Sequence, residues 1–198
     1  MKKTKFCYKT DELFDNLAAR RRFLKGLAYG TAALSMSGMT GIAKASTSWL
    51  QGPRVLAFHN LHTEEKLSLT YFEDGRYVTD AVQDLNYLLR DHRSDDVYSM
   101  DLELYDLLYD LQSMLGGNKT LQVISGYRSP STNAMLQRQS SGVAKKSLHM
   151  LGQAIDIRIE GVDSRTIQKA SIALNRGGVG YYGRSDFVHV DTGSVRHW

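Results

Sequence analysis

The chain has 198 residues, of which 42% are hydrophobic and 23% are charged. This length suits one domain, alone or with an appendage, and the composition excludes a wholly disordered or fibrous protein. The formal net charge of +4 would favour a nucleic acid or an anionic membrane as partner, provided that the charge is spread over the folded domain.

The first 45 residues have the pattern of an export leader. Arg20-Arg21-Arg22-Phe23-Leu24-Lys25 resembles the twin-arginine signal, with Ala19 where that signal usually has Ser or Thr. An uncharged, weakly apolar stretch follows and ends in the small-x-small cleavage site Ala43-Lys44-Ala45. We therefore predict a leader over residues 1–45, cleaved after Ala45, and a mature domain over residues 46–198. A retained membrane anchor is the alternative, but the stretch is poor in Leu, Ile and Val.

The leader also accounts for the basic charge. Residues 1–45 contain nine Lys or Arg and three Asp or Glu, whereas residues 46–198 contain 16 and 18, a net charge of −2. We therefore expect neither a nucleic-acid partner nor a stable membrane anchor for the mature protein. The single cysteine, Cys7, lies in the leader, so a metal in the mature domain would need His, Asp or Glu ligands.

Apolar periodicity and turn residues predict a mixed domain after the leader. The expected elements, in chain order, are strands at 54–59 and 66–72, a helix capped by Thr79, a helix over 101–115, a strand at 120–125, a short helix near 132–139, a polar loop over 140–147, a strand at 154–159, a helix over 164–175, and strands at 180–182 and 187–191. This order predicts an α+β fold with a mostly antiparallel sheet and flanking helices.

Two of the predicted strands carry side chains that bind metals. Alternation places Asp156 on the face opposite Ile155 and Ile157, and in the last strand it places His189 on one face with Asp191. If these strands are neighbours, the two side chains come close together.

A third candidate ligand, His149, precedes the first of these strands. Gly152 lets the chain turn so that His149 can fold back over Asp156. Two imidazoles and one carboxylate make a three-ligand zinc site with a fourth position for water. The alternative is that each histidine is an ordinary hydrogen-bonded residue.

Three motifs together resemble the zinc D-alanyl-D-alanine peptidase superfamily of the M15 type. They are S-G-Y-R-S at 125–129, S-x-H-x-x-G-x-A-x-D at 147–156 and F-V-H-V-D at 187–191. Residues 53–198 resemble, closer still, the family of murein endopeptidase K. The resemblance implies a hedgehog/D-Ala-D-Ala peptidase-like fold and one zinc ion per chain, held by His149, Asp156 and His189.

The resemblance also implies the other site roles. The arginine of the S-G-Y-R-S motif, here Arg128, contacts the substrate and stabilises the developing oxyanion in this family. Related enzymes carry an acid or a histidine two or three residues before the last zinc ligand, which makes Asp186 a candidate general base. Asp191 is the competing candidate, and it could instead orient a zinc ligand.

The expected function is that of an exported zinc metallopeptidase of the periplasm. Its substrates would be the peptide stems of peptidoglycan, cut at cross-links between diaminopimelate residues and also between D-Ala and diaminopimelate. The twin-arginine translocase would be its partner during export. A carboxypeptidase acting on the stem terminus and a non-catalytic peptidoglycan-binding module are the alternatives.

Overall fold

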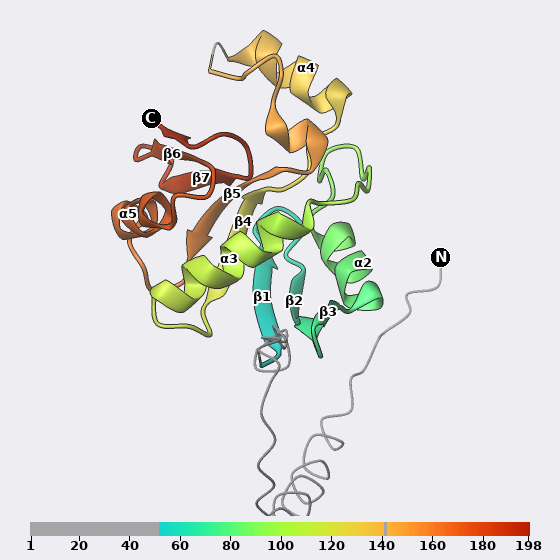
Figure 1. The fold of residues 1–198 in the computed structure, drawn as a ribbon. Helices are drawn as coiled ribbons and strands as arrows, with labels where there is room; N and C mark the ends of the chain where they lie inside the picture. The colour runs from blue at the N-terminus through green and yellow to red at the C-terminus, as the bar shows by residue number, and fades with distance from the viewer. Residues whose placement is uncertain (1–51, 141) are drawn as a thin grey trace, which may run out of the picture. The chain divides into compact units, whose positions relative to one another are not determined.

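A computed structural model describes residues 52–140 and 142–198, so the predicted leader, its twin arginines, Cys7 and the cleavage site lie outside the described residues. The described chain folds around an eight-stranded sheet with the strand order β3-β2-β1-β4-β5-β7-β6-β8 (Figure 1). The strands are β1 (Arg54–Asn60), β2 (Lys66–Glu73), β3 (Arg76–Tyr77), β4 (Thr120–Ser125), β5 (Ala154–Ile159), β6 (Gly178–Tyr182), β7 (Phe187–Asp191) and β8 (Arg196–His197).

Most neighbouring strands in this sheet are antiparallel. The pairs β1–β4 and β6–β8 are parallel, and the other five pairs are antiparallel. The predicted α+β fold with a mostly antiparallel sheet is therefore confirmed.

Helices flank the sheet, and side-chain caps start most of them. They are α2 (Thr79–Leu88), α3 (Leu102–Met114), α4 (Pro130–Gln139), the 3₁₀ helix η3 (Leu148–Leu151) and α5 (Ser164–Leu174). Asp101, Ser129 and Asp163 cap α3, α4 and α5 by accepting backbone N–H groups of the first turn. No helix within residues 52–140 and 142–198 is both long and apolar enough to cross a membrane.

The start of α2 differs from the prediction by one residue. Thr79 is its first residue, and Val78 occupies the cap position without a side-chain hydrogen bond. Val78 is held extended there because its N–H donates to the Tyr71 carbonyl in the sheet. Sheet pairing thus overrides the local preference for a Thr cap.

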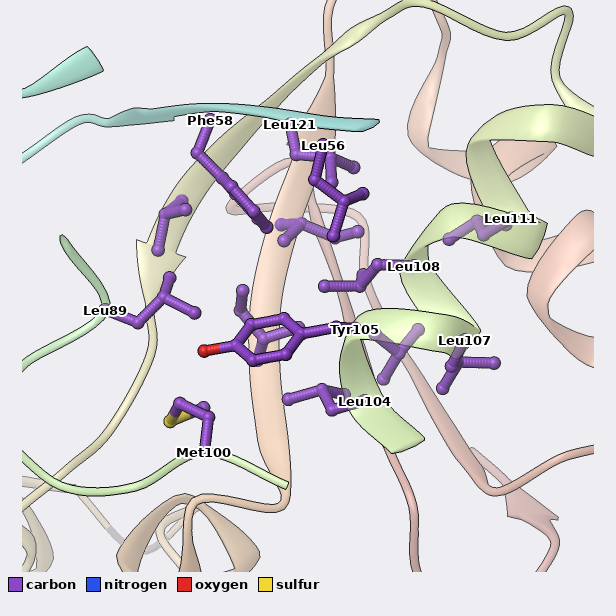
Figure 2. Packing of buried hydrophobic residues seen from close by; sticks show 14 of the residues in the cluster. Leu56, Phe58, Leu89, Met100, Leu104, Tyr105, Leu107, Leu108, Leu111 and Leu121 are labelled. Atoms are coloured by element: carbon purple, nitrogen blue, oxygen red, sulfur yellow. The ribbon is translucent and has the colours of Figure 1, made fainter. Parts of the chain in front are cut away.

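The core lies between the sheet and α3, which crosses the sheet over β1 and β4 (Figure 1). Figure 2 shows Leu108 of α3 directed at Leu56 of β1, and the ring of Tyr105 extending toward Leu89. These side chains are at most 1% exposed. Burial of each contributes about 1.5–3 kcal/mol to folding, so the core holds these strands firmly in place.

Helix α5 extends this layer along β5, β6 and β7. It ends at Leu174, and Asn175 adopts the left-handed conformation at its C-cap. The short elements β3, β8 and η3 were not predicted, because two to four residues show no usable periodicity. Two of them matter for the site, since η3 carries His149 and β8 begins at Arg196.

Candidate metal centre

The pairing of β5 with β7 places the first two candidate ligands together. Asp156 and His189 are direct cross-strand partners in this antiparallel pair, as the sequence predicted for neighbouring strands. Ile157 and Val188, the next pair, are fully buried toward the helices, so Asp156 and His189 share the opposite face. The Nδ1 atom of His189 lies 2.9 Å from Oδ1 of Asp156.

His149 reaches the same point from η3. Gly152 ends this helix with φ 68°, and a Cβ at that position would also collide with the Ser99 carbonyl. The Nε2 atom of His149 lies 3.2 Å from Nδ1 of His189 and 3.3 Å from Oδ1 of Asp156. One ligand atom from each of the three buried residues lies within 4.8 Å of the other two.

Hydrogen bonds from outside this cluster fix which ring nitrogens face it. Nδ1 of His149 donates to the Gly126 carbonyl at 2.8 Å, so in the neutral ring Nε2 carries the lone pair. Nε2 of His189 donates to Asp191 at 2.9 Å, which leaves Nδ1 of that ring facing the cluster. Two imidazole nitrogens and one carboxylate oxygen thus converge, and this donor set fits a divalent metal ion.

The carboxylate of Asp191 is fully buried and saturated with hydrogen bonds. It accepts from the N–H groups of Gly178 and Gly193, from two guanidinium nitrogens of Arg196 and from His189. Burial alone would raise the pKa of Asp191, but these hydrogen bonds hold that pKa far below its usual range. Asp191 is therefore a permanent anion on the side of His189 remote from the cluster.

The cluster itself stabilises positive charge. Burial opposes a charged His189, yet the hydrogen bonds and charges of Asp156 and Asp191 outweigh it and raise the pKa of His189 to about 9. Burial likewise opposes a charged Asp156, but His149 and His189 lower the pKa of Asp156 well below its usual range. The point between the three ligand atoms therefore favours a cation, as a metal site requires.

Arg128 lies beside the cluster, and some of its guanidinium N–H groups make only long hydrogen bonds or none among the described residues. Its backbone N–H donates to the His149 carbonyl, and its guanidinium lies 3.7 Å from Asp156. The side-chain bonds to Asn133 and Ser125 are long, at 3.5 and 3.4 Å, and Nε is buried without a partner among the described residues. Burial lowers the pKa of Arg128. An under-used buried guanidinium suits an external carbonyl or carboxylate.

Asp186 lies further from the cluster than Asp191 does. It precedes β7 in a left-handed turn conformation, φ 52°, and its side chain is 64% exposed. Its Oδ2 is 3.4 Å from Nε of Arg158, and Arg158 also donates to the backbone carbonyls of Ser185 and Asp186. Asp186 is the last residue of the turn before Phe187, which lies at the cavity border, but Asp186 does not line the cavity itself.

An open cavity borders the three candidate ligands and has an aromatic wall. Tyr182 and Phe187 stack with ring centroids 4.6 Å apart, and the indole N–H of Trp198 donates to the Tyr182 hydroxyl. The Trp198 ring centroid is 5.4 Å from that of His189. The other lining residues are Arg128, Ser140, Gly142, Val143, Ala144, Lys146, Ser147, Leu148, His149, Asp156, His189 and Arg196.

Sequence reasoning missed several contributors to this cavity. Arg196 was not recognised as the partner of Asp191, nor Asn133 as the buried residue that contacts both Arg128 and the cavity loop. Arg196 follows His189 closely in the sequence, and that proximity could have pointed to its pairing with Asp191. Asn133 shows no sequence signal, because its role depends on where α4 packs.

Comparison with known proteins identifies a family whose model covers the three candidate ligands. A family model described as peptidoglycan L,D-endopeptidase MepK matches residues 48–198. The chain belongs to this family. The resemblance to murein endopeptidase K that the motifs indicated is thereby confirmed.

The relatives match over nearly their whole length. The peptidoglycan L,D-endopeptidases MepK of Escherichia coli K12 and of Shigella flexneri are each 46% identical over 184 residues, 93% of this chain and 100% of the relative. The probable peptidoglycan L,D-endopeptidase MepK of Haemophilus influenzae is 44% identical over 175 residues, 88% of this chain and 94% of the relative.

The loop that carries Arg128 is fixed by a second buried carboxylate, Asp91. Asp91 is 1% exposed and accepts the backbone N–H groups of Arg93 and Ser129. Burial alone would raise the pKa of Asp91, but hydrogen bonds from Thr132, Ser129 and Arg93 lower it from 3.8 to about 2. The charged form of Asp91 therefore stabilises the folded loop.

We predict an acid-sensitive contribution of Asp91 to stability. Because its pKa is lowered on folding, the contribution is complete above about pH 4 and disappears as the pH falls through 2, a loss of about 2 kcal/mol. Urea unfolding between pH 2 and 6 should show a shallower acid slope for Asp91→Asn than for the unchanged protein. Equal slopes, or a carboxyl titration of Asp91 near 4 by NMR, would contradict this.

Proposed function

We propose that this protein is a zinc-dependent peptidoglycan endopeptidase. It hydrolyses the peptide cross-link between two diaminopimelate residues, and also the link between D-Ala and diaminopimelate. The observation that carries the proposal is the convergence of His149 Nε2, Asp156 Oδ1 and His189 Nδ1, each ring held by a hydrogen bond from its other nitrogen. Family membership supports the substrate class, since the relatives are named as peptidoglycan endopeptidases.

His149, Asp156 and His189 hold one zinc ion in this proposal. When bound, such an ion supplies Lewis acidity to a water molecule and to the scissile carbonyl. Arg128 donates to the carbonyl oxygen as its negative charge develops, because its guanidinium lies against Asp156 and its present hydrogen bonds are long. The aromatic wall of Tyr182, Phe187 and Trp198 packs against the peptide and limits the access of bulk water.

The two carboxylates near the end of the chain take different roles. All the acceptor positions of Asp191 are used inside the protein, so we assign it the positioning of His189. Asp186 is exposed, and its side chain contacts only Arg158, at 3.4 Å, among the described residues. In this proposal its side chain turns toward the cavity when the substrate binds. We assign to Asp186 the acceptance of the proton from the attacking water and its transfer to the departing amine.

The predicted leader indicates the compartment in which this function would be carried out. Export through the twin-arginine translocase would deliver a folded enzyme to the periplasm, where its substrate lies. Cleavage after Ala45 would remove the basic segment and leave a domain with a net charge of −2.

His149→Ala is expected to abolish both zinc binding and cleavage, because it removes a metal ligand. Purified sacculi digested with each protein, with and without a chelator, would be analysed by mass spectrometry of the products. Cross-linked dimers should become monomers only with the unchanged, metal-loaded protein. His59→Ala, outside the cluster, is the control and should keep zinc and activity. Retained cleavage by His149→Ala, or release of single terminal residues only, would contradict the proposal.

Asp186→Asn and Asp191→Asn should separate proton transfer from metal positioning. Asp186→Asn should keep its zinc and lose roughly 100-fold or more in kcat. Asp191→Asn should weaken zinc binding about 10- to 100-fold, since the ring of His189 loses its charged partner. Zinc dissociation constants from chelator competition and single-turnover rates test both. Normal zinc affinity in Asp191→Asn, or unchanged kcat in Asp186→Asn, would refute the respective role.

Export should fail when Arg20 and Arg21 are both replaced by Lys, because the twin-arginine signal needs both guanidinium groups. Fractionation and immunoblotting would follow the protein into the periplasm. Arg22→Lys leaves the pair intact and should be exported normally. Unchanged export of the double variant would rule out this route.

A further inference from the structure

The charges that line the cavity are not balanced. Arg128, Lys146 and Arg196 are its lining cations, Asp156 supplies the only side-chain carboxylate among the described lining residues, and Trp198 adds the C-terminal carboxylate. Arg196 is paired with Asp191 behind the cavity wall, and the carboxylate nearest to Arg128 is Asp156. Lys146 has no ion-pair or hydrogen-bond partner among the described residues. The cavity lining thus includes one ammonium group that no described carboxylate pairs with.

The backbone around Lys146 is anchored on both sides. Two residues before it, the Ala144 carbonyl accepts from Nδ2 of Asn133 at 3.1 Å and from Nε2 of Gln137 at 2.9 Å. Directly after it, Ser147 is buried, and η3 begins at Leu148. The base of the Lys146 side chain is therefore held at the cavity, and the residue as a whole is exposed.

One buried residue, Asn133, contacts both Arg128 and the loop that carries Lys146. Asn133 is 2% exposed, and its Oδ1 accepts from Arg128 at 3.5 Å while its Nδ2 holds the Ala144 carbonyl. One buried amide thus links the residue beside the candidate metal centre to the loop that carries the lysine. A substrate that contacts Arg128 at the scissile carbonyl would pass this loop as well.

We propose that Lys146 binds a free carboxylate of the peptide cross-link close to the scissile bond. This inference rests on the proposed endopeptidase function and names a determinant of its substrate choice. An ammonium group at the border of the cavity, with no partner among the described residues, selects an anionic group. Cross-links whose carboxylates are amidated would therefore be cleaved poorly.

Diaminopimelate provides such a carboxylate on either side of the scissile amide. The residue that gives the acyl group keeps the carboxylate of its second centre, and the residue that gives the amine carries a carboxylate on the same carbon. Either of these two carboxylates could bind the Lys146 ammonium group. Synthetic dimers with one or the other carboxylate amidated distinguish them.

The test measures kcat/KM of the zinc-loaded full chain on these dimers. Lys146→Gln should lower kcat/KM about tenfold on the unmodified dimer, because a charge-assisted hydrogen bond is lost. Amidation of the recognised carboxylate should lower it by a similar factor for the unchanged protein and hardly at all for Lys146→Gln. Lys146→Arg should restore most of the activity.

Lys145→Gln is the matched control, because Lys145 is the neighbouring exposed lysine and does not line the cavity. It should cleave all dimers like the unchanged protein. On each dimer, kcat/KM of Lys146→Gln is compared with that of the unchanged protein. If this ratio is equally low on the amidated and the unmodified dimer, the substitution disturbs the packing of the loop, and the inference is overturned. No loss on any dimer, or the same loss in Lys145→Gln, would overturn it as well.

A binding measurement keeps this inference separate from the proposed function. Isothermal titration calorimetry with a monomeric stem ending in diaminopimelate, in acid and amidated forms, needs no cleavage. The unchanged protein should bind the acid form about tenfold more tightly, and Lys146→Gln should bind both forms alike. If no dimer is cleaved but this preference holds, the endopeptidase proposal fails and the carboxylate site stands. Equal binding of both forms by the unchanged protein would refute the site.

Discussion

The antiparallel pairing of β5 with β7 is the constraint on which the site depends. It makes Asp156 and His189 direct partners and sends the flanking Ile157 and Val188 into the core. A shift of one residue in either strand would turn its isoleucines or valines outward and its candidate metal ligand inward. The buried apolar face therefore enforces the register, and the register places two candidate ligands within hydrogen-bond distance.

Buried anions then fix what surrounds this pair. Asp191 binds the start of β6, the turn after β7 and Arg196, and through Nε2 it orients the ring of His189. Asp91 fixes the loop that carries Arg128, because it accepts the backbone N–H groups of Ser129 and Arg93. In each case several donors compensate for the burial of one carboxylate, and the local chain becomes rigid as a result. The candidate centre is thus preorganised by residues that do not face it.

The charges of this chain are distributed unevenly between residues 1–45, residues 46–198 and the cavity. The basic character of the sequence belongs to residues 1–45, and residues 46–198 carry a net charge of −2. On that acidic background, Arg128 and Lys146 present cationic groups to the cavity beside the candidate metal centre. Two cationic groups in one cavity favour a small anionic group there over an extended anionic polymer across the surface.

The sequence by itself determined the longer strands and helices and the family, and it proposed the triad of His149, Asp156 and His189, because periodicity and motif spacing are local properties of the chain. It left open whether Asp186 or Asp191 faces the reaction, and it missed Arg196 and Asn133. Only the tertiary structure showed that Asp191 is saturated by groups from β6, β8 and the intervening turns, and that Asn133 joins Arg128 to the loop of Lys146. Those roles depend on contacts between distant segments, which no local pattern records.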